Sequence, residues 1–198
     1  MLKTEDVNKI LEVNDSYQQP EKLLKLMLDD DKRDDTFRQF LELETDMSYE
    51  WFQGIFENEH ADRKRKKQDF TPLSIGKLLA KLVGSNNHYF ESAVGNGGLL
   101  IQAWNEHRLQ STIGKYNPKA YWYQAEELSD RSIPFLIFNM AIRGMNGVIL
   151  HGDSLIRKFK EVYFIRNMDD FYGGFSEVIV MPKTDELKEF LNIHEWSD

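Results

Sequence analysis

Cysteine is absent from the 198-residue sequence, which excludes a disulfide framework and any metal site built on thiolates. The five histidines do not have the spacing of metal ligands, so we expect no metal ion. No apolar run approaches the ~18 residues that a membrane-spanning helix requires. Acidic residues close to the N-terminus are untypical of a signal peptide. These absences favour a cytoplasmic protein that does not insert into a membrane.

Charge is distributed unevenly along the chain, whose formal net charge is −8. Residues 1–59 contain 16 acidic and 7 basic side chains, whereas residues 60–67 contain five Lys or Arg against one Asp. The basic run fits a contact with phosphate groups or, equally, a solvated linker. The acidic balance of the whole chain disfavours non-specific binding to DNA.

Apolar residues in the N-terminal part recur at helical spacing, as in Val7, Ile10 and Leu11. The run Asp29-Asp30-Asp31 is typical of a helix break or cap. We therefore predict an N-terminal helical segment over residues 1–67 and a second unit over residues 68–198.

The second unit alternates expected strands with expected helices. The strands are predicted at 88–93, 119–126, 147–151 and 175–181, and the helices at 99–107 and 129–143. This alternation predicts an α/β fold with a parallel sheet, in which ligands bind at the carboxyl ends of the strands.

The segment that follows the first expected strand is rich in small residues. Glu91 is followed by Gly95-Asn96-Gly97-Gly98 and then by an apolar helix start. Glycines let the backbone approach a ligand closely, and a helix N-terminus offers free N–H groups to anions. The pattern predicts a nucleotide-type site, although a tight turn without a ligand would use the same glycines.

Acidic residues fall at the ends of three successive expected strands, at Glu91, Glu127 and Asp153. An adenosyl ligand presents a ribose diol and an exocyclic amine, and S-adenosylmethionine adds an ammonium group. Carboxylates accept hydrogen bonds from all three groups. Taken singly, each acid also fits the solvated end of a strand.

Several motifs between residues 69 and 184 follow one another in a fixed order. They read Asp-Phe-Thr-Pro at 69–72, Glu-Ser-Ala-Val-Gly-Asn-Gly-Gly at 91–98, Gln-Ala-Glu-Glu at 124–127, Asn-Met-Ala-Ile-Arg-Gly at 139–144 and His-Gly-Asp-Ser at 151–154. In order and spacing they resemble the N-6 adenine DNA methyltransferases, in particular the modification (M) subunits of type I restriction systems. Glu91, Ser92 and Glu126 replace the usual Asp, Pro and Gln of that family.

The resemblance implies a Rossmann-like methyltransferase sheet domain with S-adenosylmethionine as its cofactor. It implies that Phe70, Thr71 and Pro72 lie over the methionine end of the cofactor and that residues 95–98 pass beneath it. Glu127 would accept hydrogen bonds from the ribose hydroxyls, and Asp153 from the adenine amine.

The fourth motif departs from the family. Where its members carry Asn-Pro-Pro-Phe, or Asp and Tyr variants, to hold a flipped adenine, this chain has Met181, Pro182, Lys183 and Thr184. A thioether is a weak acceptor, and threonine has no ring on which a base can stack. We therefore expect this degenerate position to have lost the target base, with Met181 serving as a buried residue at the end of a strand.

Three hypotheses for function follow. The first is a truncated, methyltransferase-like protein, inactive alone, that acts by binding DNA or a protein partner. The second is an active adenine methyltransferase completed by a partner subunit or by nearby residues such as Phe171, Tyr172 and Trp196. The third is a protein of a phage or other mobile element that mimics a modification subunit and interferes with restriction.

The last expected strand, at 175–181, would leave a free sheet edge. A helix over residues 185–193 would cover it by folding back, or a second copy would pair with it in a homodimer.

Overall fold

The computed structural model describes residues 2–59, 87–111, 116–171 and 173–197. Short helices precede the sheet, as predicted. Asp29 directly precedes the helix over Asp30–Leu41, and its carboxylate accepts hydrogen bonds from the backbone N–H groups of Asp31 and Lys32. Asp29 therefore acts as the expected cap. The elements are α1 (Thr4–Leu11), η1 (Ser16–Gln18), α2 (Gln19–Met27), α3 (Asp30–Leu41) and α4 (Gln53–Glu59).

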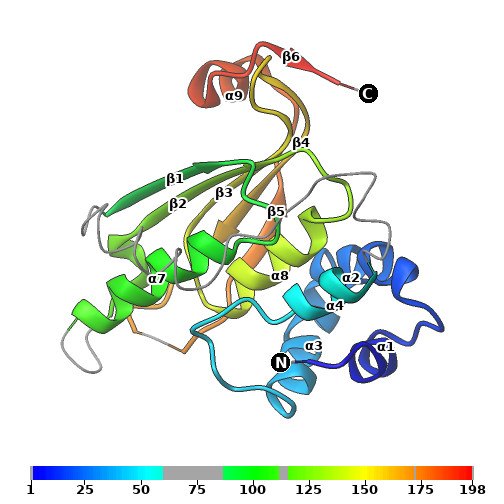
Figure 1. Ribbon diagram of the computed structural model, residues 1–198. Helices are drawn as coiled ribbons and strands as arrows, with labels where there is room; N and C mark the ends of the chain where they lie inside the picture. The colour runs from blue at the N-terminus through cyan, green and yellow to red at the C-terminus, as the bar shows by residue number, and fades with distance from the viewer. Residues whose placement is uncertain (1, 60–86, 112–115, 172, 198) are drawn as a thin grey trace.

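The N-terminal helices share one hydrophobic core with the sheet domain. Phe37, Phe40 and Phe52 all pack against Phe138, with ring centroids 5.3, 4.8 and 5.1 Å from its ring. Phe138 lies on α8 (Ile133–Ile142), every residue of which is buried. In Figure 1 the N-terminal helices lie against α8, on the side away from the sheet. The N-terminal helices therefore stabilise the helix that covers the sheet.

The sheet confirms the expected α/β arrangement. Its strand order is β1-β2-β3-β4-β5, and β1 (His88–Ser92), β2 (Trp122–Glu127) and β3 (Gly147–Asp153) are parallel neighbours. The helices α7 (Gly98–Gln110) and α8 cover one face of these strands (Figure 1). A short turn, η3 (Pro118–Ala120), leads into β2. The carboxyl ends of β1, β2 and β3 consequently meet at one edge, which we call the ligand edge.

The expectation of a fully parallel sheet is wrong, because an additional strand follows β3. β4 (Lys158–Arg166) runs antiparallel to β3, and β5 (Glu177–Val180) runs antiparallel to β4. Only four residues separate β3 from β4, too few for a parallel crossover, so the chain returns as a hairpin. Gly152 is needed at the bulge there, because a Cβ would lie 2.3 Å from the carbonyl oxygen of Lys158.

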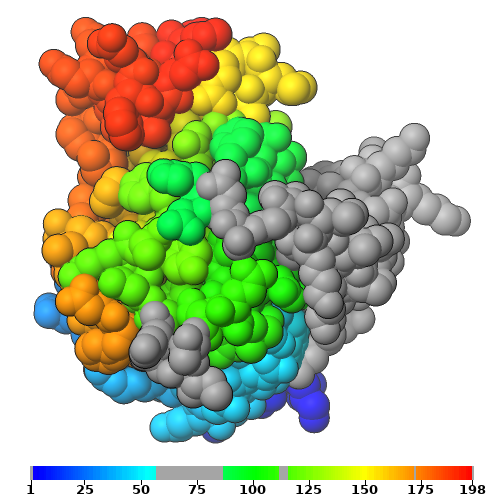
Figure 2. Space-filling model, turned by 90° about the vertical axis from the view of Figure 1, so that its left-hand side faces the viewer, coloured from blue at the N-terminus to red at the C-terminus, as the bar shows by residue number. Residues whose placement is uncertain are grey.

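The C-terminal segment packs on the other face of the sheet. Leu191 and Ile193, at the end of α9 (Asp185–Leu191) and just beyond it, join Val148, Leu150 and Phe159 in a second core cluster. β6 (Glu195–Trp196) pairs with the start of β4. Figure 2 shows this segment at one end of the molecule, with the N-terminal helices at the other. Within the described part of the chain, α9 therefore covers a face, and the outer edge of β5 stays unpaired.

No helix among the described residues is long and apolar enough to cross a membrane.

Candidate ligand site at the carboxyl edge of the sheet

The turn between β1 and α7 has the conformation that its glycines predict. The backbone leaves the strand at Ala93, with φ of +55°, and then passes through Gly95 and Gly97, with φ of +59° and +93°. Two hydrogen bonds fix it, from Val94 N–H to the Glu126 carbonyl (3.2 Å) and from Gly97 N–H to the Val94 carbonyl (3.1 Å). Positive φ favours glycine at both positions.

The two outer glycines of this turn leave room above the backbone. A Cβ on Gly95 or Gly98 would meet no described atom within 4 Å, whereas a Cβ on Gly97 would lie 3.0 Å from Leu136 Cδ1. Gly97 is therefore required by packing against α8. Among the described residues, Gly95 and Gly98 leave an open approach to the first turn of α7, whose N–H groups favour anionic acceptors. The N–H of Leu100 in this turn already donates to Glu91.

The three predicted acids lie at the carboxyl ends of neighbouring parallel strands. Glu91 is on β1, Glu127 ends β2 and Asp153 ends β3. Glu127 is buried, and its two oxygens accept hydrogen bonds from Gly95 N–H (2.7 Å) and Ser129 N–H (2.8 Å). Each oxygen keeps a second lone pair. Glu127 thus holds the glycine turn in place and retains capacity for a ligand.

Glu91 has a raised pKa. Burial raises its pKa to about 7, the hydrogen bond from the Tyr89 hydroxyl (2.9 Å) opposes that rise, and the nearby charge of Glu127 adds to it. A bound cation would favour the ionised form.

Asp153 organises the turn that leads into β4. Its Oδ1 accepts hydrogen bonds from the backbone N–H groups of Leu155 (2.8 Å) and Ile156 (3.3 Å). The side chains of Leu155, Ile156 and Leu128 are 94%, 60% and 59% exposed, beside the two acids that end β2 and β3. The sequence analysis missed them. Apolar residues directly after an acid at a strand end are the signal that would have found them.

Glu126 has a structural role. Its side chain, 1% exposed, accepts two hydrogen bonds of 2.6 Å from Arg157 Nη1. The same guanidinium donates to the carbonyls of Leu191 (2.8 Å) and Asn192 (2.9 Å). Arg157 therefore links the end of β2 to the C-terminal segment, which explains why an acid is used here.

The sequence analysis placed Asn139 and Arg143 in a motif, but it did not predict the buried polar network that they form beneath the glycine turn. Asn139 Nδ2 donates to Glu50 Oε1 (3.0 Å) and to the carbonyl of Asn96 (2.9 Å), and Arg143 donates to Asn139 Oδ1 (2.9 Å). Arg143 also donates to the Met47 and Tyr49 carbonyls. Asn139 lies within the apolar helix α8, and Arg143 follows its last residue, four positions later. Polar residues in an otherwise apolar segment were the sequence signal for this network.

The degenerate fourth motif follows β5, at the same end of the sheet as the carboxyl end of β1, but three strands lie between β1 and β5. Met181 is half-buried and packs against the second core cluster. Pro182 is exposed, and Lys183 forms an ion pair with Glu161 (3.4 Å). Thr184 caps α9, because its hydroxyl oxygen accepts from Leu187 N–H. Met181, Lys183 and Thr184 therefore each make a contact that contributes to the fold.

The described residues do not include Phe70, Thr71 and Pro72 or the basic run at 60–67.

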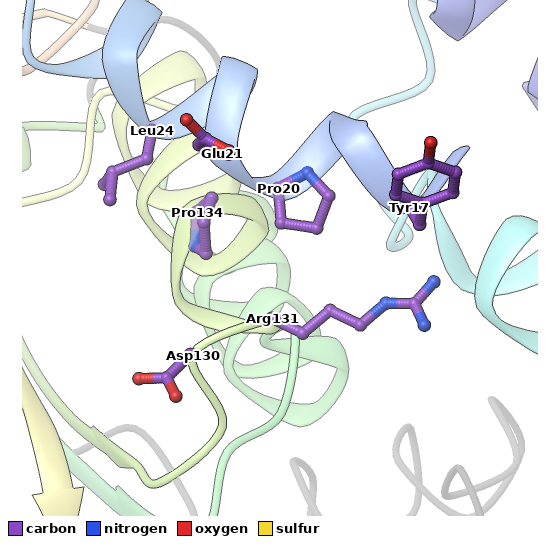
Figure 3. Close-up of a pocket in the computed structure, with 7 residues that line it drawn as sticks. All are labelled: Tyr17, Pro20, Glu21, Leu24, Asp130, Arg131 and Pro134. Carbon is purple, nitrogen blue, oxygen red and sulfur yellow. The ribbon is translucent and has the colours of Figure 1, made fainter. Parts of the chain in front are cut away.

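A separate groove lies between the N-terminal helices and the start of α8 (Figure 3). Its lining consists of Tyr17, Pro20, Glu21, Leu24, Asp130, Arg131 and Pro134. It contains none of the predicted site residues that the structure describes, so we place the candidate site at the ligand edge.

The parallel strands, the glycine turn before a helix and the acids at the strand ends together are typical of α/β domains of the nucleotide-binding type. The sequence model of the N-6 DNA methylase family matches residues 45–171 of the chain, more than half of its length. The chain therefore belongs to this family. The match ends before Met181. Comparison with curated proteins finds no match. Comparison with solved structures likewise finds none.

The residues at the ligand edge fit S-adenosylmethionine, the cofactor used in this family. The open space over Gly95 and Gly98 admits a ligand against the backbone. Glu127 and Asp153 supply acceptors, and the exposed Leu128 and Leu155 supply an apolar surface for a purine.

Proposed function

We propose that this protein binds S-adenosylmethionine or its demethylated product at the ligand edge. The observation that carries the proposal is the contact between Glu127 and the glycine turn: the acid at the end of β2 accepts a hydrogen bond from Gly95 N–H, and no described atom lies within 4 Å of a Cβ placed on Gly95 or Gly98. A ligand that bridges this acid and the N-terminus of α7 needs both hydroxyl and anionic groups. An adenosyl amino acid has both.

We further propose that the isolated chain does not methylate adenine. Four strand spacings separate β1 from β5, about 19 Å at the usual distance between strands. Methyl transfer requires the reacting atoms to lie roughly 3 to 3.5 Å apart. Met181 and Thr184 supply neither a strong acceptor nor a ring, and both have structural contacts. The protein would then act by binding DNA or a protein partner.

Calorimetric titration with S-adenosylhomocysteine and a transfer assay with labelled S-adenosylmethionine test the two parts separately. We expect binding in the micromolar range, about −8 kcal/mol, and no label in unmethylated DNA. The absence of binding heat at high ligand concentration would refute the first part. Adenine methylation by the chain alone would refute the second and favour the enzyme hypothesis.

Glu127→Ala is expected to weaken S-adenosylhomocysteine binding by ~1.5 to 3 kcal/mol, because two ribose hydroxyls would lose a charged acceptor. The turn would also lose the bond from Gly95 N–H. Glu42→Ala, which removes an exposed acid just after α3, is the matched control and should leave the affinity unchanged. Equal affinities for wild type and Glu127→Ala would remove Glu127 from the site.

The free edge of β5 supports a protein partner or a second copy of the chain, because unpaired strand edges are templates for pairing. Val180, at the end of this strand, is 46% exposed. We expect light scattering over a concentration series to report a dimer at high protein concentration. A monomer at every concentration would contradict the pairing of two copies through β5 and would leave a different protein as the partner of this edge.

A further inference from the structure

Three polar atoms beneath the glycine turn are buried without a hydrogen-bond partner. They are Glu50 Oε2 and both side-chain atoms of Asn96, Oδ1 and Nδ2. Glu50 is 5% exposed and Asn96 is 2% exposed. Buried polar atoms in folded proteins nearly always have a partner, so each exception requires an explanation.

One side chain joins these two residues. Asn139 Nδ2 donates to Glu50 Oε1 (3.0 Å) and to the Asn96 carbonyl (2.9 Å), so two hydrogen bonds through one nitrogen connect the acid to the turn. Glu50 Oε1 also accepts from Phe52 N–H (2.9 Å). The bonds to Oε1 fix the carboxylate and leave Oε2 available.

Asn96 lies two residues before α7, a helix of 13 residues, and Glu50 is connected to it through Asn139. Glu50 Oε2 is an acceptor on a carboxylate, whereas Asn96 offers one donor group and one acceptor. The helix N-terminus favours a negative group. An ammonium group next to a carboxylate, as in an α-amino acid, complements this combination of charges.

We propose that Glu50 and Asn96 form the subsite for the amino-acid end of the ligand, with Glu50 accepting from its ammonium group and Asn96 donating to its carboxylate. This inference rests on the proposed function and adds an acid from the N-terminal segment to a site otherwise built by the sheet. Glu91 is the competing acceptor, but its Oε2 already accepts from the Tyr89 hydroxyl.

Two ligands that differ in the amino-acid end provide the test. S-adenosylhomocysteine carries the ammonium and carboxylate groups, whereas 5′-methylthioadenosine keeps the adenosine and sulfur and lacks both. Both are titrated by calorimetry into wild type and into Glu50→Gln, Asn96→Ala and Glu91→Gln. Glu42→Gln, at an exposed position after α3, is the charge-matched control.

We expect Glu50→Gln and Asn96→Ala each to weaken S-adenosylhomocysteine about tenfold or more and to leave 5′-methylthioadenosine unchanged. Glutamine can keep both bonds to Oε1, and the Asn96 side chain makes no bond among the described residues, so both variants should fold. Thermal unfolding checks this.

Other outcomes overturn the proposal in distinguishable ways. If wild type binds both ligands and Glu50→Gln changes neither affinity, the subsite is wrong and the proposed function stands. A selective loss in Glu91→Gln alone would assign the ammonium to Glu91. If wild type binds neither ligand, the proposed function fails together with the subsite.

Discussion

Replacing Arg143 with alanine is expected to lower the free energy of unfolding by roughly 3 to 5 kcal/mol. The guanidinium is 3% exposed and donates to the carbonyls of Met47 (3.0 Å), Tyr49 (2.7 Å) and Asn139 (3.0 Å). Its removal leaves these acceptors buried without a donor and takes away the positive charge nearest to Glu50. Segment 47–50 would then lose its two bonds from Arg143 and keep the bond from Asn139 to Glu50.

Chemical denaturation measures this effect, and Arg38→Ala is the matched control. Arg38 pairs with Asp35 on the exposed side of α3, where ion pairs contribute ~1 kcal/mol or less. A loss in Arg143→Ala no larger than that in Arg38→Ala would mean that the network does not hold the N-terminal segment.

The stabilisation that Glu50 and Glu91 contribute is expected to fall as the pH rises from 5 to 8, whereas His107 and His151, whose pKa values are lowered by burial, act in the opposite direction as the pH rises toward their ordinary pKa of 6.5. Burial raises the pKa values of Glu50 and Glu91 to about 7, above the ordinary 4.5. Between these values the folded protein holds protons that the unfolded chain has released, so raising the pH favours unfolding. Each group contributes on the order of 2 to 3 kcal/mol over this window.

Glu50→Gln isolates one of the two groups. Glutamine accepts from Phe52 N–H and Asn139 Nδ2 as glutamate does, but it carries no charge to bury at pH 8. The variant should therefore be more stable than wild type at pH 8, and its stability should depend less on pH. Thermal unfolding at several pH values decides. If Glu50→Gln keeps the full wild-type slope, Glu50 is not the titrating group.

The sequence predicted the strands that form the ligand edge, but it missed β4, the strand that makes the sheet mixed. β1, β2 and β3 have strong local signals, because apolar runs end at acids and are separated by helices. β4 reads Lys-Phe-Lys-Glu-Val-Tyr-Phe-Ile-Arg, in which charged residues interrupt the apolar pattern, so alternation did not identify it. β4 pairs with β3 because only four residues connect the two strands, and the hydrophobic periodicity of a segment gives no information about such a pairing.

Site residues were predictable where the chemistry is local and were missed where it is built by contact. Glu127 and Gly95 each belong to a motif and could be named separately, but the bond between them spans 32 residues. Glu50 lies 89 residues from Asn139 and has no motif of its own, so only folding brings it under the turn. Long-range pairs of this kind are not encoded in spacing.

Glu126 and Glu127 are consecutive on β2, so their side chains point to opposite faces of the sheet. On one face Glu127 fastens the glycine turn, and on the other Glu126 fastens Arg157 and, through it, Leu191 and Asn192. The last two residues of β2 thus hold both the glycine turn of the candidate ligand site and the C-terminal segment in place. Removing that tail would leave Arg157 with fewer acceptors and would loosen the end of β2, which carries Glu127 of the proposed ligand site.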